Sequence, residues 1–171
     1  MKKGSYNLYN NMDKNEIHEL FENALKDPEL FSTLDIENLL ENIENDKHDY
    51  LEDKTFSDIN NEIYEKIKTL DTDTATKLNT CKKLIGYRYV DELHELHKGK
   101  HVRWIRMTTL DKKLTNGGLV TDIKFLDNGT HVLCMNSLNR FIQYKFDDCI
   151  TFQKLSTEEQ FILMAYEKVN R

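Results

Sequence analysis

The chain is poor in proline and glycine, which interrupt helices and strands, and in cysteine, which can cross-link a fold. Its 171 residues include one proline, six glycines and three cysteines. No apolar run approaches the ~20 residues that span a membrane. The start, MKKGSYNLYNN, has no apolar stretch of the kind that a secretory signal needs. The cysteines (Cys81, Cys134 and Cys149) lack CxxC spacing and are odd in number, which favours free thiols in a reducing compartment. We therefore expect an intracellular protein without a membrane segment.

Charge is plentiful but unevenly distributed. Charged residues make up 32% of the chain, and the net charge is -6. Residues 1–100 hold 14 Lys and Arg against 22 Asp and Glu, whereas residues 101–171 hold 10 against 8. This balance argues against a general nucleic-acid coat, because phosphate binding depends on clustered Lys and Arg. It leaves room for a local basic face in the C-terminal half.

Helical signals dominate the N-terminal half. We expect residues 1–12 to form a disordered tail and residues 13–85 to form an acidic region of three helices. The first two helices, residues 13–26 and 35–52, begin with Asp13 and Asp35 as N-caps. The acidic face of the second is either solvated or a docking surface for a basic partner.

The third helix starts at Phe56 and ends at Gly86, with poor helix formers at residues 71–74 where it can break. Its apolar or small positions recur in steps of three and four, and they form a stripe that packs on its own domain or serves as a homodimer seam. The stripe comprises Ile59, Ile63, Ile67, Leu70, Thr74, Leu78, Cys81 and Ile85.

Residues 101–154 change to the period-two pattern of strands. Five runs are expected to be strands: HVRWIRMTT, LVTDIKFL, THVLCM, RFIQYKF and CITFQK. One long connection, two tight turns and a short break at Asp147-Asp148 separate them, which is typical of a Src-homology-3-type or Tudor-like barrel. An oligonucleotide-binding barrel is the main competitor, but only a four-residue turn is available where that fold usually carries a helix.

The predicted fold is thus α+β: a helical region followed by a small five-stranded antiparallel β-barrel, with residues 86–171 as the barrel domain. Residues 86–90 are expected to be an extended lead-in, followed by a helical turn at residues 91–96. In LVTDIKFL, alternation assigns Leu119, Ile123 and Phe125 to one face, and Val120, Asp122 and Lys124 to the other.

A C-terminal helix is expected to close the barrel or to pack on the N-terminal helices. Ser156 and Glu159 form a capping box at its start. Residues 161–166 are apolar nearly all round, so this helix must be buried on two sides.

Catalytic and metal-binding signals are weak. His94, His97 and His101 come closest to a zinc ligand set, but lysines intervene and no cysteine pair supports them, so solvated histidines are the better interpretation. Asp147 and Asp148 fall at a strand break, where aspartate serves turns. We predict no enzymatic activity, no cofactor and no metal.

The strongest candidates for a ligand site are basic and aromatic residues of the predicted barrel. Small barrels bind through such residues by stacking or by cation–π contacts. Period-two spacing of Trp104, Phe141 and Tyr144 equally fits a barrel core, and this alternative is the stronger one. The candidate site residues are Arg103, Trp104, Arg106, Arg140, Tyr144 and Lys145.

Residues 84–165 also show a resemblance, carried by LIGYRYVDELHELHKGKHVRWIRM, LTNGGLVTDI and NRFIQYKFDDCITFQKLSTEEQFIL. These segments resemble small uncharacterised proteins of the large nucleocytoplasmic DNA viruses, especially the mimivirus-like giants. The Asn-, Lys-, Asp- and Ile-rich composition agrees with an AT-rich viral genome. The resemblance implies a setting only, in the cytoplasm of an infected host cell or in the virion.

Together these observations predict a non-enzymatic viral interaction or scaffolding protein whose partner is a viral or host protein. The alternative is a nucleic-acid-associated factor that uses the Arg/aromatic face of the barrel. A homodimer through residues 56–85 is a further expectation.

Overall fold

The structure is a computed structural model and describes residues 48–169. The predicted tail and first helix, and most of the second helix, lie outside the described residues. The part of the second helix that is described, Asp49–Leu51, is a single 3-10 turn, η1.

The described elements make an α+β fold with three α-helices and one antiparallel sheet of six strands, which confirms the predicted class. The helices are α5 (Phe56–Lys68), α6 (Thr74–Lys83) and α7 (Thr157–Val169). The strands are β1 (Tyr87–Val90), β2 (His101–Arg106), β3 (Gly118–Leu126), β4 (Gly129–Met135), β5 (Phe141–Lys145) and β6 (Cys149–Lys154). Two 3-10 turns, η2 (Leu93–Glu95) and η3 (Phe146–Asp148), lie between strands.

The predicted break in the third helix separates α5 from α6. Asp73 caps α6, because its side chain accepts a hydrogen bond of 3.0 Å from the backbone N–H of Thr76. The same partner lowers the pKa of Asp73, since its side-chain and backbone hydrogen bonds favour the carboxylate. Residues 71–74, which were expected to break the helix, therefore include the N-cap and the first residue of α6.

The sheet runs in the order β1-β6-β2-β3-β4-β5, so β1 and β5 are its two ends and it is not closed. The prediction of five strands is wrong, because the lead-in at Tyr87–Val90 pairs antiparallel with β6. This segment alternates in burial, with Arg88 and Val90 turned inward, and so behaves as a strand.

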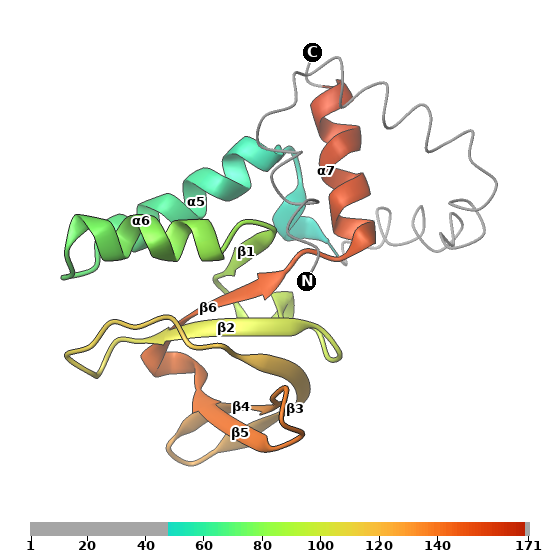
Figure 1. Ribbon diagram of the computed structural model, residues 1–171. Helices are drawn as coiled ribbons and strands as arrows, with labels where there is room; N and C mark the ends of the chain where they lie inside the picture. The colour runs from blue at the N-terminus through green and yellow to red at the C-terminus, as the bar shows by residue number, and fades with distance from the viewer. Residues whose placement is uncertain (1–47, 170–171) are drawn as a thin grey trace. The chain divides into compact units, whose positions relative to one another are not determined.

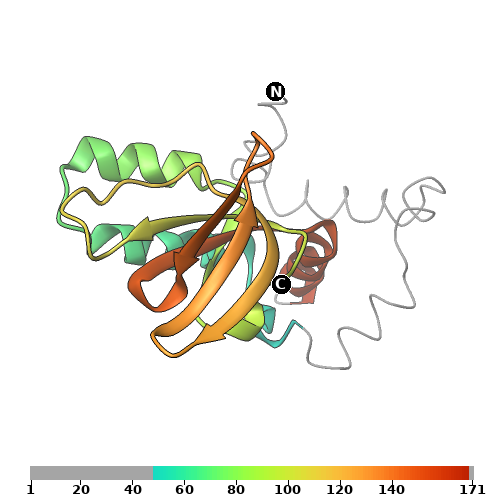
Figure 2. The same cartoon turned by 90° about the horizontal axis from the view of Figure 1, so that it is seen from below.

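A β-bulge between Val120 and Asp122 overturns the predicted faces of β3. The extra residue shifts the alternation by one position, as bulges do. Val120 is consequently buried with the core, whereas Leu119 is 48% exposed. Figure 2 shows β3 and β4, coloured gold to orange, as curved ribbons.

Residues 61–154 form one of two compact units. One face of its sheet carries a core that includes Val102, Trp104, Val132 and Tyr144. The helices cover the other face of β6 and β2, as Figure 1 shows for α5 and α6 above β2. The contacts are made by Ile63 and Ile67 of α5 and by Leu70 and Leu84, which follow α5 and α6. These residues pack with Ile105, Leu114 and Phe152.

Only part of the predicted stripe packs against the sheet of its own unit, namely Ile63, Ile67, Leu70 and the half-buried Cys81. Ile59 lies in the other core, and Thr74 and Leu78 are exposed, so the prediction of one continuous apolar stripe is wrong. The predicted domain boundary at residues 85–86 does not coincide with this grouping, because residues 61–85 share a core with the strands. A homodimer through residues 56–85 stays a prediction, with Tyr64 and Leu78 as exposed apolar residues of α5 and α6.

The second unit contains residues 48–60 together with α7 among the described residues. Ile162, Leu163 and Met164 are all buried, which confirms that α7 is covered on more than one side. They pack with Leu51, Phe56, Ile59 and Leu155, so among the described residues this helix contacts η1 and the start of α5. The predicted capping box is present, with hydrogen bonds of 3.0 and 3.1 Å between Ser156 and Glu159.

Candidate functional site

The two aromatic residues of the predicted site lie in the core of the sheet. Trp104 on β2 and Tyr144 on β5 stack with their ring centroids 4.1 Å apart, and they are 2% and 3% exposed. Thr151 on β6 donates a hydrogen bond of 3.2 Å to the Tyr144 hydroxyl. Burial raises the pKa of Tyr144 well above its usual range. These rings hold three strands together, and neither offers a face for a base to stack on.

Arg103 is committed to backbone carbonyls. Its Nε donates to the carbonyl of Thr115 at 2.9 Å, and its Nη1 donates to the carbonyl of Lys83 at 3.4 Å. Desolvation lowers the pKa of this guanidinium. Arg103 therefore ties the connection after β2 to the end of α6.

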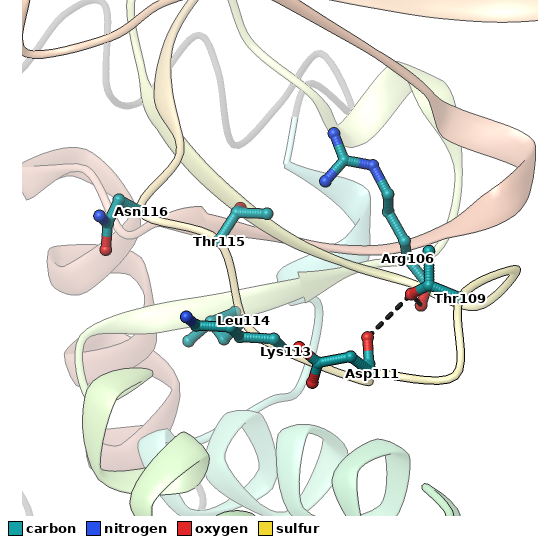
Figure 3. A pocket seen from close by; sticks show the side chains of 7 residues that line it. All are labelled: Arg106, Thr109, Asp111, Lys113, Leu114, Thr115 and Asn116. Carbon is teal, nitrogen blue, oxygen red and sulfur yellow. Dashed lines mark hydrogen bonds between the residues drawn. The ribbon is translucent and has the colours of Figure 1, made fainter.

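Arg106 is exposed at the end of β2, with its guanidinium carbon 5.9 Å from the centre of the Trp104 ring. It lines an open cleft of about 420 Å³ between β2 and the connection that follows it. Figure 3 shows the residues that line it, and its dashed line marks the hydrogen bond of 2.8 Å that Thr109 donates to the carbonyl of Asp111. The lining residues are Arg106, Thr109, Asp111, Lys113, Leu114, Thr115 and Asn116. With two cations and one carboxylate, this cleft carries a modest positive charge.

The connection that forms the cleft is held along β2 by backbone bonds. The N–H of Thr115 donates to the carbonyl of Trp104 at 3.0 Å, and Leu114 forms an isolated bridge with Ile105. Gly117 has a φ of +72°, and a Cβ on it would meet the carbonyl oxygen of Val102 at 1.8 Å. Glycine is thus required where the connection turns into β3.

The two remaining basic residues of the predicted site lie toward opposite ends of β5. Arg140 is exposed in the turn before the strand, where its backbone N–H donates to Asn136 at 3.0 Å. Lys145 ends the strand and is ion-paired with Asp148 at 3.7 Å. Of the six predicted site residues, the structure thus brings together Trp104, Tyr144 and Arg106, and it separates Arg140 from Lys145.

A different surface escaped the sequence reasoning. Leu119 pairs with Met135, and Met135 pairs with Phe141, so these three side chains form one row across β3, β4 and β5. Phe141 is 62% exposed, and Leu138 in the adjoining turn is 70% exposed. We call Leu119, Met135, Leu138 and Phe141 the apolar row. The bulge in β3 brings Leu119 to this face, and alternation read from the sequence placed it on the other.

His94, His97 and His101 are not grouped as a metal site in the described structure. His101 accepts or donates a hydrogen bond of 2.9 Å with the Tyr87 hydroxyl, and His94 lies 3.3 Å from the Glu92 carboxylate. Within residues 48–169, no three His, Cys, Asp or Glu residues are grouped so that they could hold a metal ion.

No protein-family model, no curated protein and no solved structure matches this chain. In the described part of the chain, no helix combines the length and the apolar character needed to cross a membrane.

Proposed function

We propose that this protein is a non-enzymatic interaction module that binds another protein through the apolar row. The observation that carries the proposal is the contrast between two surfaces of one sheet. The aromatic rings suited to stacking are buried, whereas Leu119 and Phe141 are exposed in one row across the strands and Leu138 is exposed in the turn before β5. Exposed apolar residues in a contiguous group mark protein-interaction sites, while scattered ones need no explanation.

We further propose that the sheet is a Src-homology-3-type small barrel with β1 added at one edge. The strand order β6-β2-β3-β4-β5 supports this assignment, as do the long connection after β2 and the 3-10 turn η3 before β6. The contact of Thr151 on β6 with Tyr144 on β5 supports it too, because these strands are four places apart in the sheet order. The proposed setting is an infected host cell or the virion, as the viral resemblance implies.

Nucleic-acid binding is the second candidate, and the cleft beside Arg106 and Lys113 is the feature that favours it. The net charge of -6 and the absence of an exposed aromatic ring among the six predicted residues weigh against it. Neither Arg103 nor Lys145 is available to phosphate without losing a contact that it makes within the protein.

Site-specific cross-linking separates the two candidates. A photoreactive phenylalanine analogue replaces Phe141 in one sample and Phe125 in another, because Phe125 is 76% exposed near the other end of β3. After irradiation in an extract of infected cells treated with nuclease, we expect protein adducts at position 141 and few at position 125. Equal labelling at both positions would argue against a specific protein site.

A salt titration with single- and double-stranded oligonucleotides provides the complementary test. We expect no micromolar binding near physiological salt. Binding that falls steeply with salt and is lost in Arg106→Ala/Lys113→Ala would instead establish the nucleic-acid function, since each phosphate contact adds roughly one log unit to the salt slope.

A further inference from the structure

Strand β5 is an open edge of the sheet. Within residues 48–169, β4 is the only strand that pairs with it (Figure 1). Native proteins protect such edges with charged side chains, with proline or with a covering segment. The sequence of β5, FIQYK, has no proline, and its one charged residue, Lys145, stands at its end. The centre of the strand therefore lacks the features that keep an edge from pairing with another strand.

The register with β4 determines which backbone groups of β5 point outward. The N–H of Asn136 donates to the carbonyl of Arg140 at 2.9 Å, so these residues form a hydrogen-bonded pair. Such pairs alternate along an antiparallel ladder, so Ile142 also directs its N–H and C=O groups at β4. Phe141 and Gln143 direct theirs away from β4. In the described part of the chain, these outward groups have no hydrogen-bond partner.

The side chains at this edge include two apolar residues that a further strand would cover. Phe141 is 62% exposed, and Gln143 is exposed on the same face of the strand. Ile142 lies on the opposite face, where it is half-buried against the core that contains Tyr144. A strand added beside β5 thus gains both backbone hydrogen bonds and apolar contacts.

The two ends of β5 carry opposite charge. Arg140 is exposed just before the strand. The other end holds Lys145 with Asp147 and Asp148, so one cation stands there against two carboxylates. Lys145 is ion-paired with Asp148 at 3.7 Å, and Asp147 accepts a hydrogen bond of 2.9 Å from the N–H of Thr130. When two copies of β5 run antiparallel, each Arg140 end lies beside the acidic end of the other copy, and the charges balance at both ends.

We propose that β5 pairs antiparallel with β5 of a second copy of this chain, around a symmetry axis at Ile142. In this register Phe141 of each copy faces Gln143 of the other, so the outward N–H and C=O groups of both residues are bonded. Ile142 faces Ile142, and the two Phe141 rings become diagonal neighbours within reach of each other. The same surface patch serves both copies, as a symmetric dimer requires.

This inference goes beyond the proposed function, because it concerns the edge of the sheet and not its outer face. Leu119 and Met135 stay uncovered in such a dimer. The two apolar rows meet at Phe141 and form one longer surface, which remains open to a different protein.

Sedimentation equilibrium of the full chain over a concentration series measures self-association, and we expect a reversible monomer–dimer equilibrium. Gln143→Pro removes one outward N–H from each copy and should weaken the dimer about tenfold or more. Proline is accepted at this position because the missing N–H is not part of the ladder with β4. Gln143→Thr keeps the N–H and suits a strand, so it should change the dissociation constant by less than about twofold.

A third variant separates this dimer from the predicted homodimer through residues 56–85. Leu78 is 57% exposed on α6. We expect Leu78→Asp to leave the dissociation constant of the dimer unchanged. The melting curve of each variant, together with emission from Trp104, establishes that the sheet is intact.

Photochemical cross-linking locates the contact without depending on the proline variant. A photoreactive phenylalanine analogue replaces Phe141 in the purified protein. We expect adducts of two chains in which mass spectrometry joins position 141 to residues 141–143 of the other copy. The same analogue in place of Phe125, an exposed ring near the other end of β3, should give few adducts.

Three results would overturn the inference: a monomer at every concentration, a dimer that persists in folded Gln143→Pro, or adducts that map outside β5. A dimer that is lost only in Leu78→Asp would place the contact on α6 instead. Adducts with a different protein in the extract of infected cells, without a dimer of the purified chain, would leave the proposed function standing and remove only the edge pairing.

Discussion

The indole of Trp104 lies against the phenol ring of Tyr144 at a centroid distance of 4.1 Å and an interplanar angle of 15°. The two residues are 40 positions apart in sequence, on β2 and on the edge strand β5. Stacked aromatic pairs contribute beyond the area they bury. In the sheet order, β3 and β4 lie between β2 and β5, so this contact joins two strands that are not neighbours.

Removing Tyr144 should therefore destabilise the sheet strongly. We expect Tyr144→Ala to lower the free energy of unfolding by about 3–5 kcal/mol, because it leaves a cavity and takes away the ring that stacks on Trp104. Urea denaturation followed by Trp104 fluorescence measures this change. Phe141→Ala on the same strand is the matched control and should cost less than about 0.5 kcal/mol, because its side chain is largely exposed. Similar losses for both variants would contradict the assigned burial.

Gly117 and Gly99 form a second matched pair. Both have positive φ, +72° and +80°, but a Cβ on Gly99 meets nothing within 4 Å. We expect Gly99→Ala to cost about 1–2 kcal/mol from backbone conformation alone. Gly117→Ala adds a clash with the Val102 carbonyl and should cost clearly more, or prevent folding. Equal melting temperatures for the two variants would show that the connection after β2 can shift to accept a side chain.

The half-buried thiol of Cys149 should make the protein less stable at alkaline pH. Burial raises its pKa from 9.0 to about 11, so the folded state holds the thiol proton more tightly than the unfolded state. The resulting stabilisation is complete below pH 9 and is lost as the pH rises toward 11. Unfolding midpoints measured from pH 8 to 11 should fall more steeply for the natural chain than for Cys149→Ala. A parallel decline in both proteins would assign the effect to other groups, such as Cys134, whose pKa burial raises to about 12.

The C-terminal helix gives a prediction for the other unit. We expect Leu163→Asp to lower stability by on the order of 3 kcal/mol, because it buries an unpaired carboxylate among Leu51, Phe56 and Ile59. Thr157→Asp is the control, since Thr157 is exposed in the first turn of α7, where a negative charge interacts favourably with the helix dipole. Thermal unfolding followed by circular dichroism distinguishes them. An unchanged melting temperature for Leu163→Asp would show that α7 is peripheral.

Local patterns in the sequence were sufficient to predict most elements of the described chain. The capping box at Ser156 and Glu159, the break before Thr74 and the turn residues between strands all act within a few positions along the chain. The alternation of polar and apolar residues located β2, β4, β5 and β6 within a few residues of their observed bounds. Such signals are readable because the physical interactions that cause them are short in range.

Tertiary structure decided the rest. The pairing of Tyr87–Val90 with β6 joins segments more than 60 residues apart, and no local pattern states which strand will be the neighbour. The bulge at Val120 exchanged the faces of Leu119 and Val120, because one unpaired residue reverses the alternation beyond it. Whether an aromatic side chain becomes core or surface depends on the strand opposite it. Trp104 meets Tyr144 and is buried, whereas Phe141 pairs with Met135 on the outer face and stays exposed.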